Sequence, residues 1–412
     1  MRSRSILLVA QLSPPAGMSA ARRTAGLTKY LARLGHEVTV LTSQTSGDGD
    51  IAGAARVLRT PDLMATRLNW RRRHYEALNE GKGKAYADGA SRVASIVVPD
   101  LALVGWIPFA LPAALRHARR HRPDCVITTS PPESAHLVGM ALKRQGIPWI
   151  ADLRDGWGYE TTHPDWPLSL QHRLDRALES ATVRGADQVT TVTEPITDDI
   201  RARYGVAADT VPNGFDPDER VRARPDQIGL DPSTHTVVHT GRMAVASRDP
   251  RPLIEALRLL TERRPADDAP IEAVFAGPLT EEESGLIESS RGMARAVGTL
   301  EREDTLRLQS AAGTLVLLTG RGRRSEATAK LYEYLAAGRP ILVLGDESAA
   351  AEIVRATGSG EAVPANDPTA IAAGLERLMA APRDSDANGR VERYSYETIA
   401  GQMAAHVERL AA

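Results

Sequence analysis

The sequence predicts an α/β protein built from two doubly wound, Rossmann-like domains that face a central cleft. Three observations support this fold class. Short apolar runs of strand length alternate with segments of helical spacing along most of the chain. A turn-rich segment, which begins at Val211-Pro212-Asn213-Gly214, separates two such series. The chain has 412 residues, more than one ordinary core supports, so at least two domains are expected.

The first series begins with an apolar strand at residues 5–10 and a helix at residues 20–34. The helix is expected to end at Gly35, because glycine adopts the backbone conformation that terminates many helices. Further strands are predicted at residues 38–41, 125–128, 149–151 and 188–192. Further helices are predicted at residues 112–121, 134–145 and 170–184.

The second series repeats this alternation. Its strands are predicted at residues 237–240, 272–276, 315–318 and 341–343, and its helices at residues 253–263, 305–312 and 328–337. An amphipathic helix at residues 392–411 closes the chain and is expected to pack back on the first domain. The predicted boundaries are 1–212 with 390–412 for the N-terminal domain, 213–234 for a linker, and 235–389 for the C-terminal domain.

The bulk composition is that of a soluble globular protein, with 42% apolar and 25% charged residues. A net charge of −1 provides no general attraction to nucleic acid or to anionic lipid, and no nucleic-acid partner is expected. The single cysteine, Cys125, lies in an apolar run and cannot form a disulfide framework or a thiolate metal site. This usage fits a reducing cytoplasm.

Neither export nor membrane insertion is predicted. The apolar run at residues 6–10 is too short for a signal peptide and is better explained as a strand. Residues 94–115 are the most membrane-like stretch, but Asp100 and three prolines interrupt it, so a spanning helix is not expected. The prediction is a cytoplasmic protein, with peripheral contact at the inner face of the membrane left open.

Two glycine-containing turns follow the first strands of the two series. Gly17 and Ser19 lie between the first strand and its helix, where backbone N–H groups can approach a phosphate or a sugar; an ordinary turn is the alternative. Gly241 and Arg242 repeat this placement after residues 237–240. The Arg242 guanidinium can bind a diphosphate through two parallel hydrogen bonds, and Arg248 can supply a second cation. A surface salt bridge is the alternative for each arginine.

The segment KLYEYLAAGRP, residues 330–340, is the most informative part of the chain. It predicts a helix that carries one carboxylate, Glu333, and runs through Gly-Arg-Pro into the apolar run 341–344. In open α/β sheets, ligands bind near the carboxyl ends of strands and at helix N-termini. The segment therefore predicts a ligand site in the second domain.

Six segments, in this order, resemble the motifs of family 4-type glycosyltransferases of the GT-B fold: ARRTAGLTKYLARLGHEVTVLT, IADLRDGW, VPNGFDP, HTGRM, GTLEREDTLRLQSAAGTLVLL and KLYEYLAAGRPIL. The chain is similar above all to bacterial members with a D-[FL]-R-D-x-W signature, present at residues 152–157. The resemblance implies transfer of a sugar, with retention of configuration, from a nucleotide diphosphate-sugar to an acceptor hydroxyl. It implies an acceptor-binding N-terminal domain, a nucleotide-sugar-binding C-terminal domain, no metal and no cofactor beyond the nucleotide-sugar co-substrate.

The resemblance assigns the donor site residue by residue. Glu333 matches the second glutamate of the family's E-x₇-E motif, which holds the ribose hydroxyls. The first glutamate would fall at Ser325, and Glu326 is one position away, which leaves the donor sugar open. Leu300 matches the position whose backbone reads the nucleobase edge.

The resemblance also assigns the residues that neutralise the leaving diphosphate. Arg242 and Arg248 match the family's cationic pair, although lysine is commoner at the second position. Lys330 and the backbone of Thr328, Ala329 and Leu331 are expected to add donors at the helix N-terminus. These groups face the charge that develops as the glycosidic bond breaks, so they are predicted to be catalytic together with Glu333.

Four further residues are candidates for the transferred sugar or the acceptor. Arg154 and Asp155 fall near the position of a histidine that faces the transferred sugar in many relatives. They are therefore predicted to be catalytic, by holding sugar hydroxyls or by stabilising positive charge at the anomeric carbon; a structural ion pair is the alternative. Glu133 and His136 follow the predicted strand 125–128 and are candidate acceptor ligands. A helix N-cap formed by Ser130 or Ser134 would also explain that segment.

Two apparent metal motifs are not expected to bind metal. Asp48-Gly49-Asp50 is a literal D-x-D, but it lies in a polar loop without a flanking apolar strand. His117 and His121 share a helix face, but no third ligand accompanies them, so both are expected to be solvated.

Two rival functions remain open: a sugar-nucleotide epimerase on the same fold, and a catalytically silent nucleotide-sugar-binding protein. Under the transferase reading, small-molecule, lipid-linked and glycan acceptors are all compatible. Cell-surface glycan and secondary-metabolite glycoside biosynthesis are the candidate pathways. The sequence specifies neither the oligomeric state nor the donor base.

Overall fold

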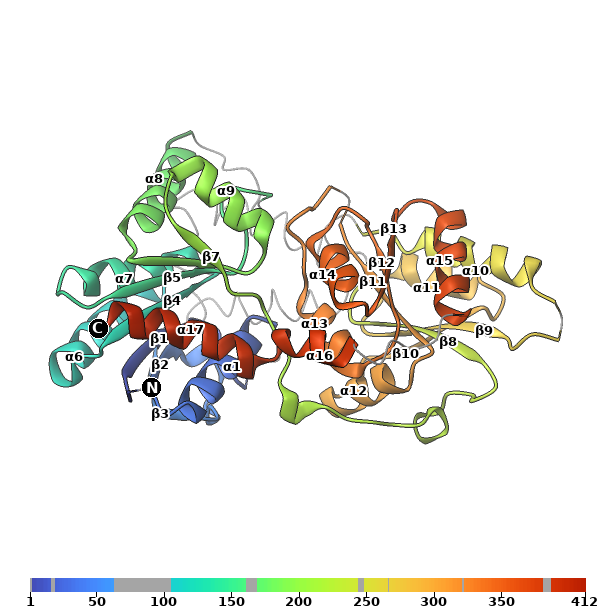
Figure 1. Ribbon diagram of the computed structural model, residues 1–412, viewed down its shortest axis with the longest axis horizontal. Coiled ribbons are helices and arrows are strands. Elements are labelled where there is room, and N and C mark those ends of the chain that lie inside the picture. The colour runs from blue at the N-terminus through green and yellow to red at the C-terminus, as the bar shows by residue number, and fades with distance from the viewer. Residues whose placement is uncertain are drawn as a thin grey trace. The chain divides into compact units, whose positions relative to one another are not determined.

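The computed structural model describes residues 2–15, 19–62, 105–160, 169–243, 248–265, 267–320, 322–380 and 387–412. The chain forms two compact units (Figure 1). The first contains the described residues up to Gly214 together with Tyr396–Ala412, and the second contains Phe215–Ser395. Each unit is built on its own parallel sheet, which confirms the predicted fold class of two doubly wound α/β domains.

The sheet of the first unit has the strand order β3-β2-β1-β4-β5-β6-β7. Its strands are β1 (Ser5–Val9), β2 (Glu37–Ser43), β3 (Ala54–Thr60), β4 (Cys125–Ser130), β5 (Trp149–Leu153), β6 (Gln188–Thr191) and β7 (Ala208–Thr210). Its longer helices are α1 (Ser19–Arg33), α6 (Ile107–His121), α7 (His136–Lys143), α8 (Ser169–Gly185), α9 (Glu194–Tyr204) and α17 (Tyr396–Leu410). None of the described helices is long and apolar enough to cross a membrane.

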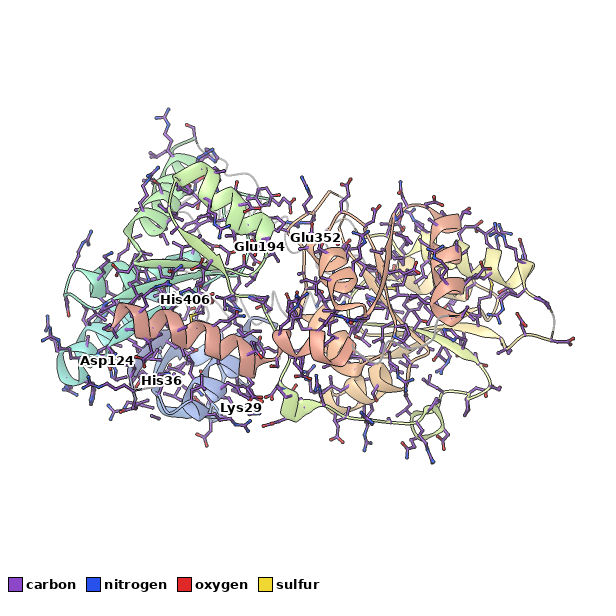
Figure 2. The ribbon with its side chains drawn as sticks, viewed as in Figure 1. Lys29, His36, Asp124, Glu194, Glu352 and His406 are labelled. Carbon is purple, nitrogen blue, oxygen red and sulfur yellow. The ribbon has the colours of Figure 1, made fainter. Side chains whose placement is uncertain are left out.

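The two faces of this sheet are both apolar, as expected for parallel strands covered on both sides. Ile6 and Leu8 of β1 pack on one face with α1 and α17, whereas Leu7 and Val9 pack on the other with α6 and α7. At the amino end of β1, Asp124, which is labelled in Figure 2, accepts a hydrogen bond from the Ser5 N–H at 2.8 Å. Cys125 lies wholly in the core, and burial raises the pKa of its thiol, in keeping with a packing role.

The C-terminal helix α17 packs on α1, which confirms the prediction that the end of the chain returns to the first unit. It begins at Tyr396, later than the predicted residue 392, because Glu392–Tyr394 form a separate 3₁₀ turn within the second unit. Gly26 permits the close packing of the two helices: a Cβ there would lie 2.3 Å from the Tyr396 ring.

The sheet of the second unit has the strand order β10-β9-β8-β11-β12-β13. Its strands are β8 (His235–Thr240), β9 (Ile271–Ala276), β10 (Ala294–Gly298), β11 (Thr314–Leu318), β12 (Ile341–Leu344) and β13 (Gly360–Val363). Its helices include α10 (Arg251–Arg263), α11 (Glu281–Glu288), α12 (Arg302–Ala311), α13 (Ala329–Ala337), α14 (Ala349–Thr357), α15 (Pro368–Ala380) and α16 (Ala387–Val391). One face packs on α10 and α15, and the other packs on α12, α13 and α14.

The segment predicted as a linker, residues 213–234, belongs almost entirely to the second unit. Phe215 and Leu230 are 4% and 3% exposed and pack in the core beside α12 and α13. The chain therefore changes units over a few residues near Gly214, and again between Ser395 and Tyr396.

Candidate active site

The candidate donor site lies at the carboxyl edge of the second sheet, where β8 and β11 are neighbours. The chain leaves β8 toward α10 on one face and leaves β11 toward α13 on the other. Such a divergence of adjacent connections is the usual place for a ligand crevice in a doubly wound sheet. Gly241 follows β8 directly, and Lys330 lies in the first turn of α13.

Gly241 and Lys330 pack directly against each other. Gly241 has a φ of +81°, and a Cβ at this position would lie 2.6 Å from Cε of Lys330. The Lys330 ammonium donates a hydrogen bond to the carbonyl of Arg242 at 3.0 Å. The missing side chain at position 241 thus makes room for a cation beside the turn.

His239, the penultimate residue of β8, supports this arrangement, and it was not predicted from the sequence as a site residue. Its Nδ1 lies 2.9 Å from the carbonyl of Val316, and its Nε2 lies 3.4 Å from Nζ of Lys330. Burial, and then Lys330, lower the pKa of His239 to about 3, so the ring is neutral. A proton on Nδ1 satisfies Val316 and leaves the Nε2 lone pair facing the ammonium.

The pKa of the Lys330 ammonium is strongly lowered. Burial of its ammonium and the nearby Arg248 lower its pKa to about 7; Glu326 opposes this change and Arg242 adds to it. Two guanidinium groups and one carboxylate thus act on this ammonium. A buried excess of positive charge is costly, and an anionic ligand would remove that cost.

Arg248 forms an ion pair with Glu326, not the surface salt bridge considered as its alternative. Both side chains are 11% exposed, and the second carboxylate oxygen of Glu326 accepts the N–H of Gly320 at 2.6 Å. The Nε of Arg248 is buried and has no hydrogen-bond partner among the described residues. Arg248 also lines a cavity of about 780 Å³ at the carboxyl edge, together with Thr280 and Thr319.

Glu333 lies one turn further along α13 and is held from two sides. Its Oε2 accepts the Gln309 amide at 3.0 Å, and its Oε1 lies 3.0 Å from a guanidinium nitrogen of Arg302. Gln309 also donates to Oγ1 of Thr240 at 2.9 Å, which ties Glu333 to the end of β8. A carboxylate has about four lone-pair positions, so Glu333 retains capacity for hydroxyl donors.

The remaining predicted donor-site residues lie at the start of α13 and just after β10. Thr328 is the N-cap of α13, and its Oγ1 is buried without a hydrogen-bond partner among the described residues, so no side chain caps the helix there. Ala329 opens the helix, and Leu300 lies half-buried just after β10. Leu331 is fully buried in the core and its N–H donates to Thr328, so this residue presents neither its side chain nor its N–H to a ligand.

In the first unit, Arg154 and Asp155 follow β5 at the carboxyl edge of the sheet. Arg154 is 8% exposed and donates to the carbonyls of Ser130 and Pro131 at 2.8 and 2.5 Å. Asp155 is exposed. Arg154 is therefore fixed by backbone acceptors as well as by the charge of Asp155, and it links the ends of β4 and β5.

The first aspartate of the same motif, Asp152, has a structural role that the sequence did not reveal. It is fully buried and forms a bidentate pair with Arg23 of α1 at 2.7 and 2.9 Å. Arg23 also donates to the carbonyls of Val211 and Pro212 at 3.0 and 2.7 Å. This pair fixes α1, β5 and the start of the crossover to the second unit in one network.

The candidate acceptor residues Glu133 and His136 are buried, at 3% and 0% exposure. Nδ1 of His136 lies 2.7 Å from Oγ1 of Thr128, and its ring stacks on Trp157. Burial lowers the pKa of His136 to about 4 despite the nearby Glu133. The N-cap explanation was wrong, because Ala135 precedes α7 and no side chain caps that helix.

Gly17 lies outside the described residues, and Ser19 is described only as the first residue of α1. Asp48 and Asp50 are exposed in the loop after β2. The prediction of a solvated histidine pair was wrong for His117, which is 7% exposed and packs against His121. No cluster of three metal-ligating side chains occurs among the described residues.

Two family models match successive parts of the chain. Residues 19–214 match the glycosyl transferase 4-like domain, and residues 234–381 match the glycosyl transferases group 1. No curated protein sequence matches the chain.

Solved structures resemble the chain over almost its whole length. Sucrose-phosphate synthase from Thermosynechococcus elongatus is 18% identical, with 99% of each chain covered and a TM-score of 0.66. A glycosyltransferase from Rickettsia africae is 13% identical, with 100% and 99% covered and a TM-score of 0.63. The UDP-forming α,α-trehalose-phosphate synthase from Burkholderia xenovorans, in complex with glucose-6-phosphate, is 14% identical, with 98% and 100% covered and a TM-score of 0.62. At these identities the likeness establishes the fold alone.

Proposed function

The chain belongs to the family 4-like glycosyltransferases of the GT-B fold, and from that premise we propose a retaining, metal-independent enzyme. In this proposal it transfers a sugar from a nucleotide diphosphate-sugar to an acceptor hydroxyl. The second unit binds the donor, and the first unit binds the acceptor. The match of each unit to a different glycosyltransferase model supports this division.

The observation that carries the proposal is the cation cluster around Gly241. Lys330 and Arg248 lie at the carboxyl edge of the sheet, with Glu326 as their nearby carboxylate. Cleavage of the donor's glycosidic bond leaves negative charge on the departing diphosphate. Fixed cations and the uncapped N-terminus of α13 stabilise that charge more than the charge of the intact donor, which is the requirement for catalysis.

The other donor contacts follow from the same placement. Glu333 accepts hydrogen bonds from the ribose hydroxyls, and the backbone at Leu300 contacts the base. Arg242 adds positive charge beside the diphosphate. The first N–H groups of α13, at Thr328 and Ala329, bind phosphate oxygens. Glu326 remains engaged with Arg248 and Gly320, so the transferred sugar is recognised without the family's first glutamate, whose position holds Ser325.

The acceptor binds at the carboxyl edge of the first sheet, near Arg154 and Asp155. Glu133 and His136 lie behind this edge, and Ser19 opens α1 beside it. We assign the chain to the bacterial subgroup with the D-[FL]-R-D-x-W signature, supported by residues 152–157. The single buried thiol supports a cytoplasmic reaction.

A panel of nucleotide diphosphate-sugars, screened by thermal shift and then by donor-dependent release of nucleoside diphosphate, tests the function. A stabilising donor that releases nucleoside diphosphate only with an acceptor supports the transferase. Epimerised donor without any acceptor would establish the epimerase, and donor binding without turnover across the acceptor panel would favour the silent protein. Retention is tested by comparing the anomeric configuration of product and donor by NMR, where inversion refutes it.

Glu333→Gln tests the ribose assignment. We expect donor affinity to fall about tenfold, because a carboxylate accepts stronger hydrogen bonds from hydroxyls than an amide does. Glu352→Gln, at an exposed position on α14, is the matched control and should leave affinity unchanged (Figure 2). Equal donor affinity in both variants, measured by calorimetry, would contradict the assignment.

A further inference from the structure

Helices α6, α7 and α8 cover one face of the first sheet, and α9 packs on the same face beside α8. The helix α9 carries three carboxylates and two arginines: Glu194, Asp198, Asp199, Arg201 and Arg203. Ala114 of α6 and Val138 of α7 pack in one cluster with Ala151 of β5. Val183 of α8 packs with Leu153, which points to the same side of β5 because side chains alternate along a strand. The outward sides of α6, α7 and α8 therefore form one surface, named here the basic face.

The basic face carries positive charge that the net charge of the chain conceals. The three helices contain seven lysines and arginines and two carboxylates. Glu179 is buried and paired with Arg203, whereas Asp175 accepts a hydrogen bond from the neutral indole of Trp157 and so remains one carboxylate on this face. Lys143 is paired with Asp187, and the excess of positive charge comes from the six arginines. The arginines that point away from the sheet are exposed; they include Arg116, Arg119, Arg120, Arg173 and Arg176.

Two leucines protrude among these arginines. Leu170 and Leu174 of α8 are 62% and 48% exposed, and they are the exposed large hydrophobic side chains among the described residues. They lie one turn apart, on the same outward side as Arg173. Because α8 follows β5, its first turns lie at the carboxyl edge of the sheet, the edge that carries Arg154 and Asp155.

We propose that the basic face docks on an anionic lipid bilayer. The arginines match the charge of the headgroups, and Leu170 and Leu174 enter the apolar boundary beneath them. A nucleic acid would satisfy the arginines but offers no comparable environment for two exposed leucines. Docking through α8 brings the edge that binds the acceptor, under the proposed function, to the membrane surface.

Vesicle sedimentation of the full-length protein tests the proposal. We expect binding to vesicles of phosphatidylglycerol and phosphatidylcholine, weakening as salt is raised, and no binding to phosphatidylcholine alone. Two double variants, Leu170→Ser with Leu174→Ser and Arg173→Glu with Arg176→Glu, should each reduce partitioning at least tenfold. Arg263→Glu, an exposed charge reversal at the end of α10, is the matched control and should bind as the wild type does.

Three results would overturn the proposal. The first is equal binding to neutral and anionic vesicles, and the second is unchanged partitioning of both double variants. The third is no binding to vesicles together with tight binding to a DNA duplex that depends on α8. Circular dichroism and melting temperature establish that each variant is folded. Donor affinity is measured without vesicles. A failure of the membrane-docking proposal can therefore be distinguished from a failure of the proposed glycosyltransferase function. Variants that lose vesicle binding should retain wild-type donor affinity.

Discussion

Lys330 shows how one side chain connects the fold to the proposed chemistry. An ammonium packed against Gly241 loses hydration, and the two nearby arginines add repulsion, so its proton is held weakly. The hydrogen bond to the Arg242 carbonyl and the neutral His239 keep the amine in place. A diphosphate bound here would offset the repulsion and strengthen the hold on the proton.

Donor binding should therefore depend on pH. The pKa of Lys330 in the free protein is lowered to about 7, so the cation is present below pH 7 and must be regained on binding above it. Affinity for a nucleoside diphosphate should fall by up to about tenfold per pH unit between pH 7 and 9, with proton uptake. Calorimetry in buffers of different ionisation enthalpy measures both quantities.

Lys330→Arg is the control for this pH dependence, because a guanidinium stays charged throughout the range. The His239 ring is neutral throughout this range, because its pKa is lowered to about 3, so it should not replace the lost titration. A pH profile that is identical in wild type and variant would rule out Lys330 as its source.

Gly241→Ala tests the contact between the turn and Lys330. The new Cβ would meet Cε of Lys330 at 2.6 Å, at a φ that favours glycine, so the amine must move. We expect donor affinity to fall at least tenfold. Gly338→Ala is the control: its φ is +64° with no atom within 4 Å, so it should cost about 1 kcal/mol in stability but leave donor affinity unchanged. Equal losses of donor affinity in the two variants would contradict the proposed role of the contact between Gly241 and Lys330.

At the scale of elements, α1 fixes both chain crossings. Arg23 binds Asp152 and the carbonyls at residues 211 and 212, and Gly26 receives the ring of Tyr396 at the start of α17. The two segments that connect the first unit to the second are thus held by one helix, through residues that lie three positions apart in α1. This explains why the chain can change units over so few residues.

Gly26→Ala should destabilise the first unit by about 1–3 kcal/mol, because its Cβ would overlap the Tyr396 ring and force the helices apart. Gly401→Ala lies in α17 with no atom within 4 Å of the added Cβ and should stabilise by about 0.5–1 kcal/mol. Denaturant unfolding measures both changes. The two substitutions should change the free energy of unfolding in opposite directions, and a stabilising Gly26→Ala would refute the packing argument.

The strands that the sequence revealed are the ones largely buried on both faces. Residues 341–343 are continuous apolar sequence, and β12 is completely buried there. The strand β3 was not predicted, because this edge strand is polar and partly exposed, so its apolar signal is weak. The late start of α17 was missed for a different reason: Tyr396 is fixed by contact with Gly26, which is remote in sequence.

At the scale of the molecule, the sequence predicted residues that lie at the carboxyl edge of the second sheet, but it did not predict the contacts between them. Gly241, Arg248 and Lys330 were identified from motif resemblance and from their places after strands. The pairing of Arg248 with Glu326 and the contact of His239 with Lys330 join residues 78 and 91 positions apart. No local spacing predicts such contacts, because the order of strands in the sheet creates them.

The central claim is that fixed cations in the second unit stabilise a departing diphosphate. A crystal structure with bound nucleoside diphosphate tests it most directly. We predict a terminal phosphate within hydrogen-bond distance of Lys330 and Arg248, and ribose hydroxyls on Glu333. Phosphates bound elsewhere, with Lys330 still in contact with the Arg242 carbonyl and His239, would contradict it.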